Sequence, residues 1–293
     1  MGEFLQQLIN GLQTGSIFAL IALGYTMVYG IAKMINFAHG DVIMVGAYSL
    51  FVLVEQVKMP AIPAVIITIL VCSLLGVTIE KIAYKPLRKA PSLAVLITAI
   101  GVSFFLQSLA LLIFKPNPRP FQSIIKVEAL PIGDVTIQGI TLVTLVVTTV
   151  CMVVLTLFIN KTKMGRAMRA VSEDKAAAQL MGINVNRTIS MTFAIGSALA
   201  AVAGILYICQ YGSVKPTLGA LPGIKAFIAA VLGGIGSVPG AMIGGILLGV
   251  IESLALGYLP NSDLADAIVF GVLVLVLLVK PSGLLGKNRI EKV

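Results

Sequence analysis

The residues that could bind or react are few, and they lie inside long apolar segments. Asn36, His39, Gly40 and Asp41 share a short polar run that interrupts the first apolar block, and His39 is the single histidine. A neutral imidazole and a carboxylate at such a break can hydrogen-bond the backbone groups that the break frees, or the charged head of a passing solute. With one histidine, which lies in a membrane break, neither a Ser-His-Asp site nor a paired-carboxylate site is supported.

A second interruption, Gly-Gly-Ile-Gly-Ser-Val-Pro-Gly at residues 233–240, contains the candidates Gly236, Ser237 and Gly240. Paired broken helices in two halves of a membrane chain indicate a transport pathway. Alternatively, both breaks are packing kinks, with glycines serving as contacts between helices. Glu252 follows in an apolar segment, where a carboxylate is costly and therefore a functional candidate. It could instead lie near the membrane face or pair with Lys225.

A polar loop at about residues 161–188 contains a predicted short helix, residues 172–181. Ser172 is a suitable N-cap, acidic residues fill the first turn, and Gly182 stands where a C-terminal glycine ends a helix. The helix is too polar to span a membrane, so we interpret it as a knob that docks into another protein; the alternative is a solvated connector. The residues assigned to this element are Ser172, Glu173, Asp174, Ala176, Ala177, Ala178, Met181 and Gly182.

The elements that must position these residues are membrane helices. Hydrophobic residues make up 58% of the 293 residues, charged residues 11%, and the mean hydropathy is +1.03. Uncharged runs cover residues 4–32, 59–79, 90–114, 135–160 and 188–214, each at least as long as the ~20 residues that span a bilayer. We therefore predict an all-α, polytopic transmembrane helix bundle with eight or nine membrane segments, two of them broken or short. Residues 1–293 form a single transmembrane domain.

The net charge of +9 reflects membrane topology. Fourteen of the 21 Lys and Arg residues fall in residues 81–89, 161–187 and 280–292, between or after apolar runs. This is the positive-inside pattern, which places these stretches in the cytoplasm. The proline-containing segment at about residues 115–139 is then a loop or hairpin on the opposite side. If the short segment after His39 crosses fully, the N-terminus is also outside. No aromatic residues interleave with the basic ones, which argues against nucleic-acid binding.

Metal and nucleotide sites are not expected. The three cysteines lack metal-ligand spacing, and residues 283–288, the nearest approach to a P-loop, lack its glycine spacing and its Ser/Thr. We expect no cofactor on this chain, which is not expected to be an enzyme. If ATP drives transport, a different subunit must hydrolyse it.

Three segments, residues 35–48, 165–183 and 232–241, resemble the Liv-type permeases, most closely the H-subunit family of branched-chain amino acid ABC importers. The resemblance runs over about residues 5–285. It implies a multi-pass inner-membrane permease that translocates leucine, isoleucine and valine. It also implies a second homologous permease, two cytoplasmic ABC ATPases and a periplasmic amino-acid-binding protein as partners. The helix at residues 172–181 would be the coupling helix, seated in a groove of an ATPase.

Two other functions remain open from the sequence. Urea and short-amide importers use closely similar permeases. A secondary transporter that works alone would also suit paired broken helices, although the capped loop helix and the scarcity of intramembrane carboxylates disfavour it. Whether the second permease is identical, and which residues touch the solute, are not predicted.

Overall fold

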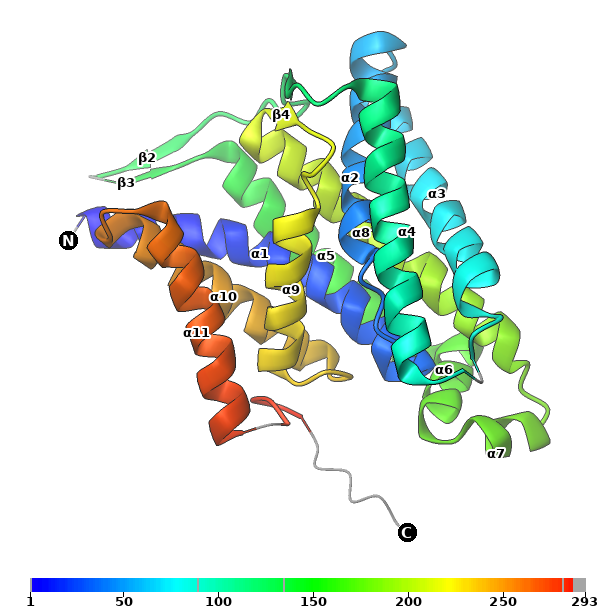
Figure 1. The fold of residues 1–293 in the computed structure, drawn as a ribbon. Helices are drawn as coiled ribbons and strands as arrows, with labels where there is room; N and C mark the ends of the chain where they lie inside the picture. Colours follow the sequence, from blue (N-terminus) through cyan, green and yellow to red (C-terminus); the bar gives the residue numbers. More distant parts are fainter. Residues whose placement is uncertain (1, 89, 134, 281, 287–293) are drawn as a thin grey trace.

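The computed structural model describes residues 2–88, 90–133, 135–280 and 282–286, which form a helical bundle with two small antiparallel sheets (Figure 1). The helices are α1 (Gly2–Ala32), α2 (His39–Phe51), α3 (Ala61–Ile79), α4 (Ser92–Phe114), α5 (Gly139–Lys161), α6 (Lys163–Glu173), α7 (Lys175–Leu180), α8 (Val185–Tyr211), α9 (Ala220–Gly233), α10 (Val238–Tyr258) and α11 (Ser262–Val279). The π-helical turns η1 (Val52–Gln56) and η2 (Glu80–Tyr84) extend α2 and α3, and the strands are β1 (Arg119–Pro120), β2 (Leu130–Ile132), β3 (Val135–Ile137) and β4 (Ser213–Val214).

The long helices follow the uncharged runs of the sequence, as predicted. Within the described residues, six helices are long and apolar enough to cross a membrane: α1, α3 with η2, α4, α5, α8 and α10. The apolar helices α2 and α9 are shorter, with 13 and 14 residues. The prediction of a helical membrane protein is therefore confirmed, whereas the count of eight or nine segments is not.

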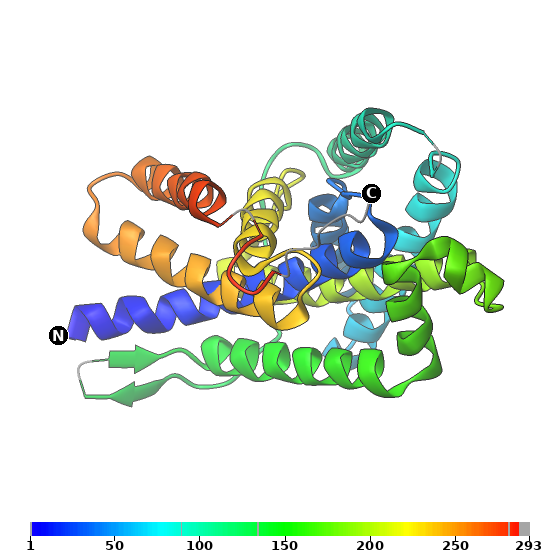
Figure 2. The ribbon, with the colours of Figure 1, turned by 90° about the horizontal axis from the view of Figure 1, so that it is seen from below.

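Helices α1 and α8 form the centre of the bundle, and α3, α4 and α5 lie at its outside. The most apolar window of α1 is 89% buried, compared with 17% in α4 and in α5. An apolar helix that exposes most of its surface requires lipid around it. Figure 2 shows α1 running between α5 on one side and α9, α10 and α11 on the other.

Glycines allow α1 and α10 to approach closely. A Cβ added to Gly11 would lie 2.7 Å from the Cα of Val250, and one added to Gly15 would lie 2.8 Å from the Cα of Ile246. Such backbone contact is the usual way in which membrane helices associate, because lipid offers no hydrophobic driving force between them. Small residues on α1 and α10 thus join the first and last parts of the chain.

The bundle has two distinct ends. The end of α1, the turn after η2, and α6 and α7 lie together at one end, which we call the basic face. The last described residues also lie near this end, because the amide of Leu284 donates to the carbonyl of Leu232 at the end of α9. Lys89, Pro281 and residues 287–292, which belong to two of the predicted basic stretches, lie outside the described residues.

The opposite end contains the start of α1 and a small hairpin. Strands β2 and β3 pair antiparallel, with Leu130 opposite Ile137. The side chain of Gln6 hydrogen-bonds the backbone of Thr136 in both directions, at 3.0 and 3.1 Å. Strands β1 and β4 also pair, which ties residues 115–139 to the end of α8. The predicted hairpin is therefore present, and its side of the membrane stays a prediction.

Candidate functional site

The first break, residues 33–38 between α1 and α2, is held by polar side chains from neighbouring helices. The hydroxyl of Tyr84 donates to the side-chain oxygen of Asn36 at 2.9 Å. The amide of Gln107 on α4 donates to the carboxylate of Asp41 at 2.9 Å. Because backbone without helical hydrogen bonds is tolerated at membrane depth only when protein or water surrounds it, these contacts explain how the break persists.

His39 and Gly40 form the start of α2 and are both buried. The imidazole of His39 packs edge-on against Tyr25 of α1, with 4.7 Å between ring centroids. A Cβ on Gly40 would lie 2.6 Å from the carbonyl oxygen of Gly219 and 3.3 Å from the Cα of Gly223. The start of α2 therefore lies directly against the start of α9.

This contact between two helix starts was not predicted from the sequence. The prediction placed the late break only at residues 233–240, whereas α9 itself begins at Ala220, after the irregular residues 215–219. The turn residues Gly212, Pro216 and Gly219 were the available signal. Two short helices, α2 and α9, thus begin inside the bundle and face each other.

The second break, between α9 and α10, depends on glycine in two ways. Gly234 and Gly236 have φ values of +102° and +96°, which residues with a side chain rarely adopt. Ser237 caps α10 by accepting a hydrogen bond from the amide of Gly240 at 3.2 Å. Gly240 itself is helical, and an added Cβ would collide with the carbonyl oxygen of Gly233. Gly240 is therefore required for close approach.

An ion-pair cluster joins α9, α10 and α11; Lys225 and Glu252 are buried, whereas the side chain of Asp266 is 37% exposed. The ammonium of Lys225 lies 2.6 Å from the carboxylate of Glu252 and 2.6 Å from that of Asp266. The alternative in which Glu252 pairs with Lys225 is therefore the observed arrangement. Asp266 was not among the predicted site residues, although an acidic residue in the last apolar segment was a signal for it.

A polar cavity of about 330 Å³ opens beside Glu252, toward the end of the bundle that contains the hairpin. Three buried polar atoms in its lining have no hydrogen-bond partner within the described residues: Gln13 Nε2, Gln210 Oε1 and Glu252 Oε2. Buried polar atoms are almost always paired with protein or water. The cavity is therefore suited to water or to a polar solute. The remaining lining residues are Gln7, Asn10, Thr14, Gln138, Tyr211, Ser253 and Leu256.

The predicted loop helix begins later than expected. Ser172 lies within α6, where its hydroxyl donates to the carbonyl of Arg169 at 2.7 Å, so its prediction as the N-cap was wrong. Asp174 caps α7 by accepting from the amides of Ala176 and Ala177 at 2.7 and 3.0 Å. Because α6 continues through Ser172 to Glu173, the next helix can begin only at Asp174. Gly182 has a φ of +80° and ends the turn, as predicted.

The residues assigned to the loop helix differ in how exposed they are. Ala176 and Ala177 are exposed. Ala178 is buried within the chain, so it is not available to a partner, contrary to its assignment to the docking element. Leu180 and Met181 are 89% and 82% exposed and form an apolar tip. Leu180 was not predicted as a site residue. The two side chains are adjacent in the chain and form a small exposed apolar surface on an otherwise polar loop.

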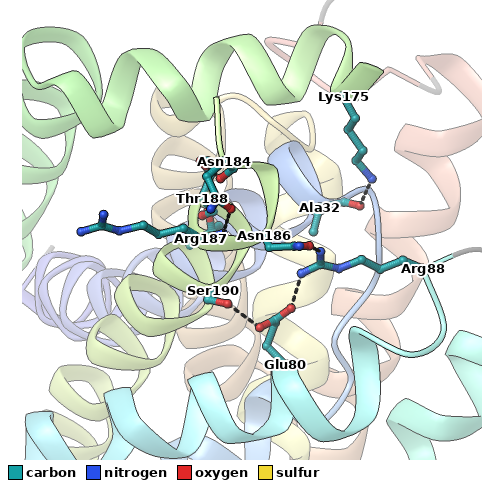
Figure 3. A network of polar contacts seen from close by, with 10 residues as sticks. Ala32, Glu80, Arg88, Lys175, Asn184, Asn186, Arg187, Thr188 and Ser190 are labelled. Carbon is teal, nitrogen blue, oxygen red and sulfur yellow. Dashed lines mark hydrogen bonds and ion pairs between the residues drawn. The ribbon is translucent and has the colours of Figure 1, made fainter. Parts of the chain in front are cut away.

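A polar network fixes the base of the loop to the bundle (Figure 3). The fully buried carboxylate of Glu80 accepts from Arg88 and, at 2.6 Å, from the hydroxyl of Ser190 on α8. Arg88 also donates to Asn186. The ammonium of Lys175 on α7 donates to the carbonyl of Ala32 at 2.8 Å. This network was not predicted from the sequence; the signal was an acidic residue at the end of an apolar run, beside a basic stretch.

Apolar helices that face lipid, two short helices that begin inside the bundle, and a polar cavity between the spans together define a multi-pass membrane protein built for transport. Residues 7–277 match the family described as branched-chain amino acid transport system / permease component, and the chain belongs to this family.

Curated relatives match over nearly their whole length. The chain is 46% identical over 304 residues to the high-affinity branched-chain amino acid transport system permease protein BraD of Pseudomonas aeruginosa, covering 99% of this chain and 98% of that protein. It is 45% identical over 303 residues to the permease protein LivH of Escherichia coli K12, with the same coverage. A probable LivH of Methanocaldococcus jannaschii is 29% identical, covering 92% of this chain and 89% of that protein.

Proposed function

We propose that this chain is the membrane-spanning subunit of an ABC importer through which leucine, isoleucine and valine cross the inner membrane. The observation that carries the proposal is the family match over residues 7–277, together with 46% identity to a high-affinity branched-chain amino acid permease. In this proposal the chain binds no cofactor and is not an enzyme.

The proposed topology has nine passes. Six of the passes are the long helices. The other three are α2 with η1, residues 213–233, and α11, each of which is proposed to run between the two ends of the bundle. The N-terminus and residues 115–139 are then outside, and residues 161–188 and the C-terminus are cytoplasmic. Arg88, Lys175 and Arg187 all come from segments at the basic face, which supports this orientation (Figure 3).

The proposed pathway runs past the starts of α2 and α9. Asn36, His39, Gly40 and Asp41 lie at the first break, and Gly236, Ser237 and Gly240 at the second. Gly40 touches α9 with no side chain between the two backbones, so a small shift of either helix changes this contact directly. The polar cavity next to Glu252 supports an entrance for solute on the outer side.

The motion driven by ATP hydrolysis in a partner subunit is proposed to reach the membrane helices through α7. Its exposed tip, Leu180 and Met181, fits an apolar groove on a separate cytoplasmic ATPase. Displacement of the tip would reach α1 through Lys175 and would reach α3 and α8 through the Glu80 network. Two ATPases, a second homologous permease and a periplasmic amino-acid-binding protein complete the proposed complex.

Copurification tests this proposal against a transporter that works alone. The tagged chain is extracted from native membranes in mild detergent, and the proteins that copurify with it are identified by mass spectrometry. We expect ATPases with a Walker motif and a second permease in stoichiometric amounts. A chain that purifies alone, yet catalyses amino acid uptake in vesicles without ATP, would refute the importer assignment.

A further inference from the structure

A second cavity, of about 470 Å³, opens at the basic face between the end of α1, the start of α4 and α7. Its lining contains three cations from separate segments, Lys33, Arg88 and Lys175, and none of the described residues that line it is acidic. The carboxylate of Glu80 pairs with Arg88 but does not line the cavity. Three cations that are far apart in the sequence and meet at one cavity through folding indicate a site for an anion.

The electrostatics of Lys175 support this interpretation. Burial, together with the nearby positive charges of Arg88 and Lys33, lowers the pKa of the Lys175 ammonium below its usual value. The folded chain therefore carries a repulsion at this point that a bound anion would relieve. Lys33 is the first residue after α1, where a backbone φ of +59° ends the helix and turns the chain beside the cavity.

One wall of the cavity is apolar and belongs to the lipid-facing helix α4. Leu93 and Leu96, at the first turns of α4, line it, and Leu93 is 63% exposed. Only 17% of the apolar window of α4 is buried inside the protein, so this helix faces the hydrocarbon. A cavity that is basic at the end of the bundle and apolar along a lipid-facing helix matches a phosphate headgroup with attached acyl chains.

We propose that this cavity binds the phosphate of an anionic phospholipid from the cytoplasmic leaflet, which holds α7 against the ends of α1 and α4. Binding itself does not depend on the transported solute. The further role, in which the lipid steadies the coupling helix, rests on the proposed function.

Native mass spectrometry of the purified complex tests the site. The complex is exchanged into a defined mixture of phosphatidylglycerol and phosphatidylcholine, and the retained lipids are counted for the wild type, Lys33→Asn and Lys175→Gln. Asparagine suits the left-handed backbone at position 33. Lys81→Gln is the matched control. Lys81 is an exposed cation in the same basic stretch as Arg88, but it does not line the cavity.

We expect the wild type and Lys81→Gln to retain phosphatidylglycerol preferentially. Each cavity variant should bind it about fivefold more weakly, the effect of one basic residue near an anionic surface. A thermal unfolding curve shows whether each variant is folded. Equal retention of both lipids by the wild type, or an unchanged preference in both cavity variants, would overturn the site.

A competition arm separates a lipid from a free phosphate. Inorganic phosphate or glycerol 3-phosphate is added to the complex loaded with phosphatidylglycerol. Retention of the lipid supports a headgroup site anchored by acyl chains. Displacement by inorganic phosphate, at a concentration where chloride has no effect, would overturn the lipid assignment in favour of a soluble phosphate. Because copurification of ATPases is measured separately, failure of this site leaves the importer proposal standing.

Discussion

The ammonium of Lys225 lies 2.6 Å from the carboxylate of Glu252, and the same ammonium bonds Asp266 at 2.6 Å. One buried cation therefore joins α9 to both α10 and α11. Lys225 and Glu252 are only 7% and 9% exposed, so each depends on the other to offset the loss of water. The contact therefore links three helices in the late part of the chain.

Removal of Lys225 should destabilise the protein more than removal of Glu252. Lys225→Met leaves two carboxylates without their cation, whereas Glu252→Gln leaves Lys225 paired with Asp266. We expect a loss of about 3–5 kcal/mol for Lys225→Met, the usual result of breaking a buried pair, and a smaller loss for Glu252→Gln. Thermal unfolding in detergent, followed by the monodisperse fraction, measures both. The reverse order of stability would show that Asp266 does not share the ammonium.

Replacement of Gly240 by valine should impair transport. An added Cβ would collide with the carbonyl of Gly233, so α9 and α10 would have to separate at the second break. Gly101→Val is the control, because a Cβ at Gly101 in the lipid-facing α4 meets nothing within 4 Å. Uptake is compared at equal protein levels. Normal uptake by Gly240→Val would show that this close contact is dispensable.

The exposed face of α7 should be required for coupling. Ala177→Glu and Leu180→Glu place a charge where an ATPase is proposed to dock, and burying an unpaired charge costs several kcal/mol. Both changes should abolish uptake and weaken ATPase association, and neither should unfold the chain, since both positions are exposed. Ser172→Ala should have little effect, since Ser172 is not the cap of α7. Wild-type uptake and association in both glutamate variants would leave the loop as a connector.

The cap of α7 is a separate prediction. Asp174→Ala removes an acceptor for two amides, which should cost about 1 kcal/mol of local helix stability. Asp174→Asn keeps most of the cap and is the control. Hydrogen exchange of residues 175–180 in the complex should be faster for Asp174→Ala than for either the wild type or Asp174→Asn. Identical exchange in all three proteins would contradict the assignment of Asp174 as the cap.

The membrane topology can be measured by cysteine labelling. In a background without the three native cysteines, a cysteine at Thr136 should react with an impermeant reagent in intact cells, because the hairpin is proposed to be outside. A cysteine at Gln179 should react only after the cells are opened. Both positions are exposed, so access depends on the side of the membrane. Ready labelling at position 179 in intact cells would invert the proposed orientation.

Much of the fold could be predicted because lipid imposes a simple rule on the sequence. An uncharged run such as residues 188–214 has to become a helix, since no other single segment satisfies its backbone in hydrocarbon. The Ser172 cap could not be predicted, because Ser172 and Asp174 are both good caps and only the continuation of α6 decides between them. The contact of Gly40 with Gly219 and the hydrogen bond from Ser190 to Glu80 join segments whose meeting depends on helix packing, which the local pattern does not encode.

The most direct measurement of the proposed function is uptake by proteoliposomes that contain the purified complex and its amino-acid-binding protein. Labelled leucine, isoleucine and valine are compared with urea and acetamide, with and without ATP in the compartment of the ATPases. We expect uptake of the branched-chain amino acids that requires both ATP and the binding protein, and no ATP-dependent uptake of urea or acetamide. ATP-dependent uptake of urea or acetamide in place of leucine would contradict the assigned substrate, and leucine uptake independent of ATP would contradict the importer mechanism.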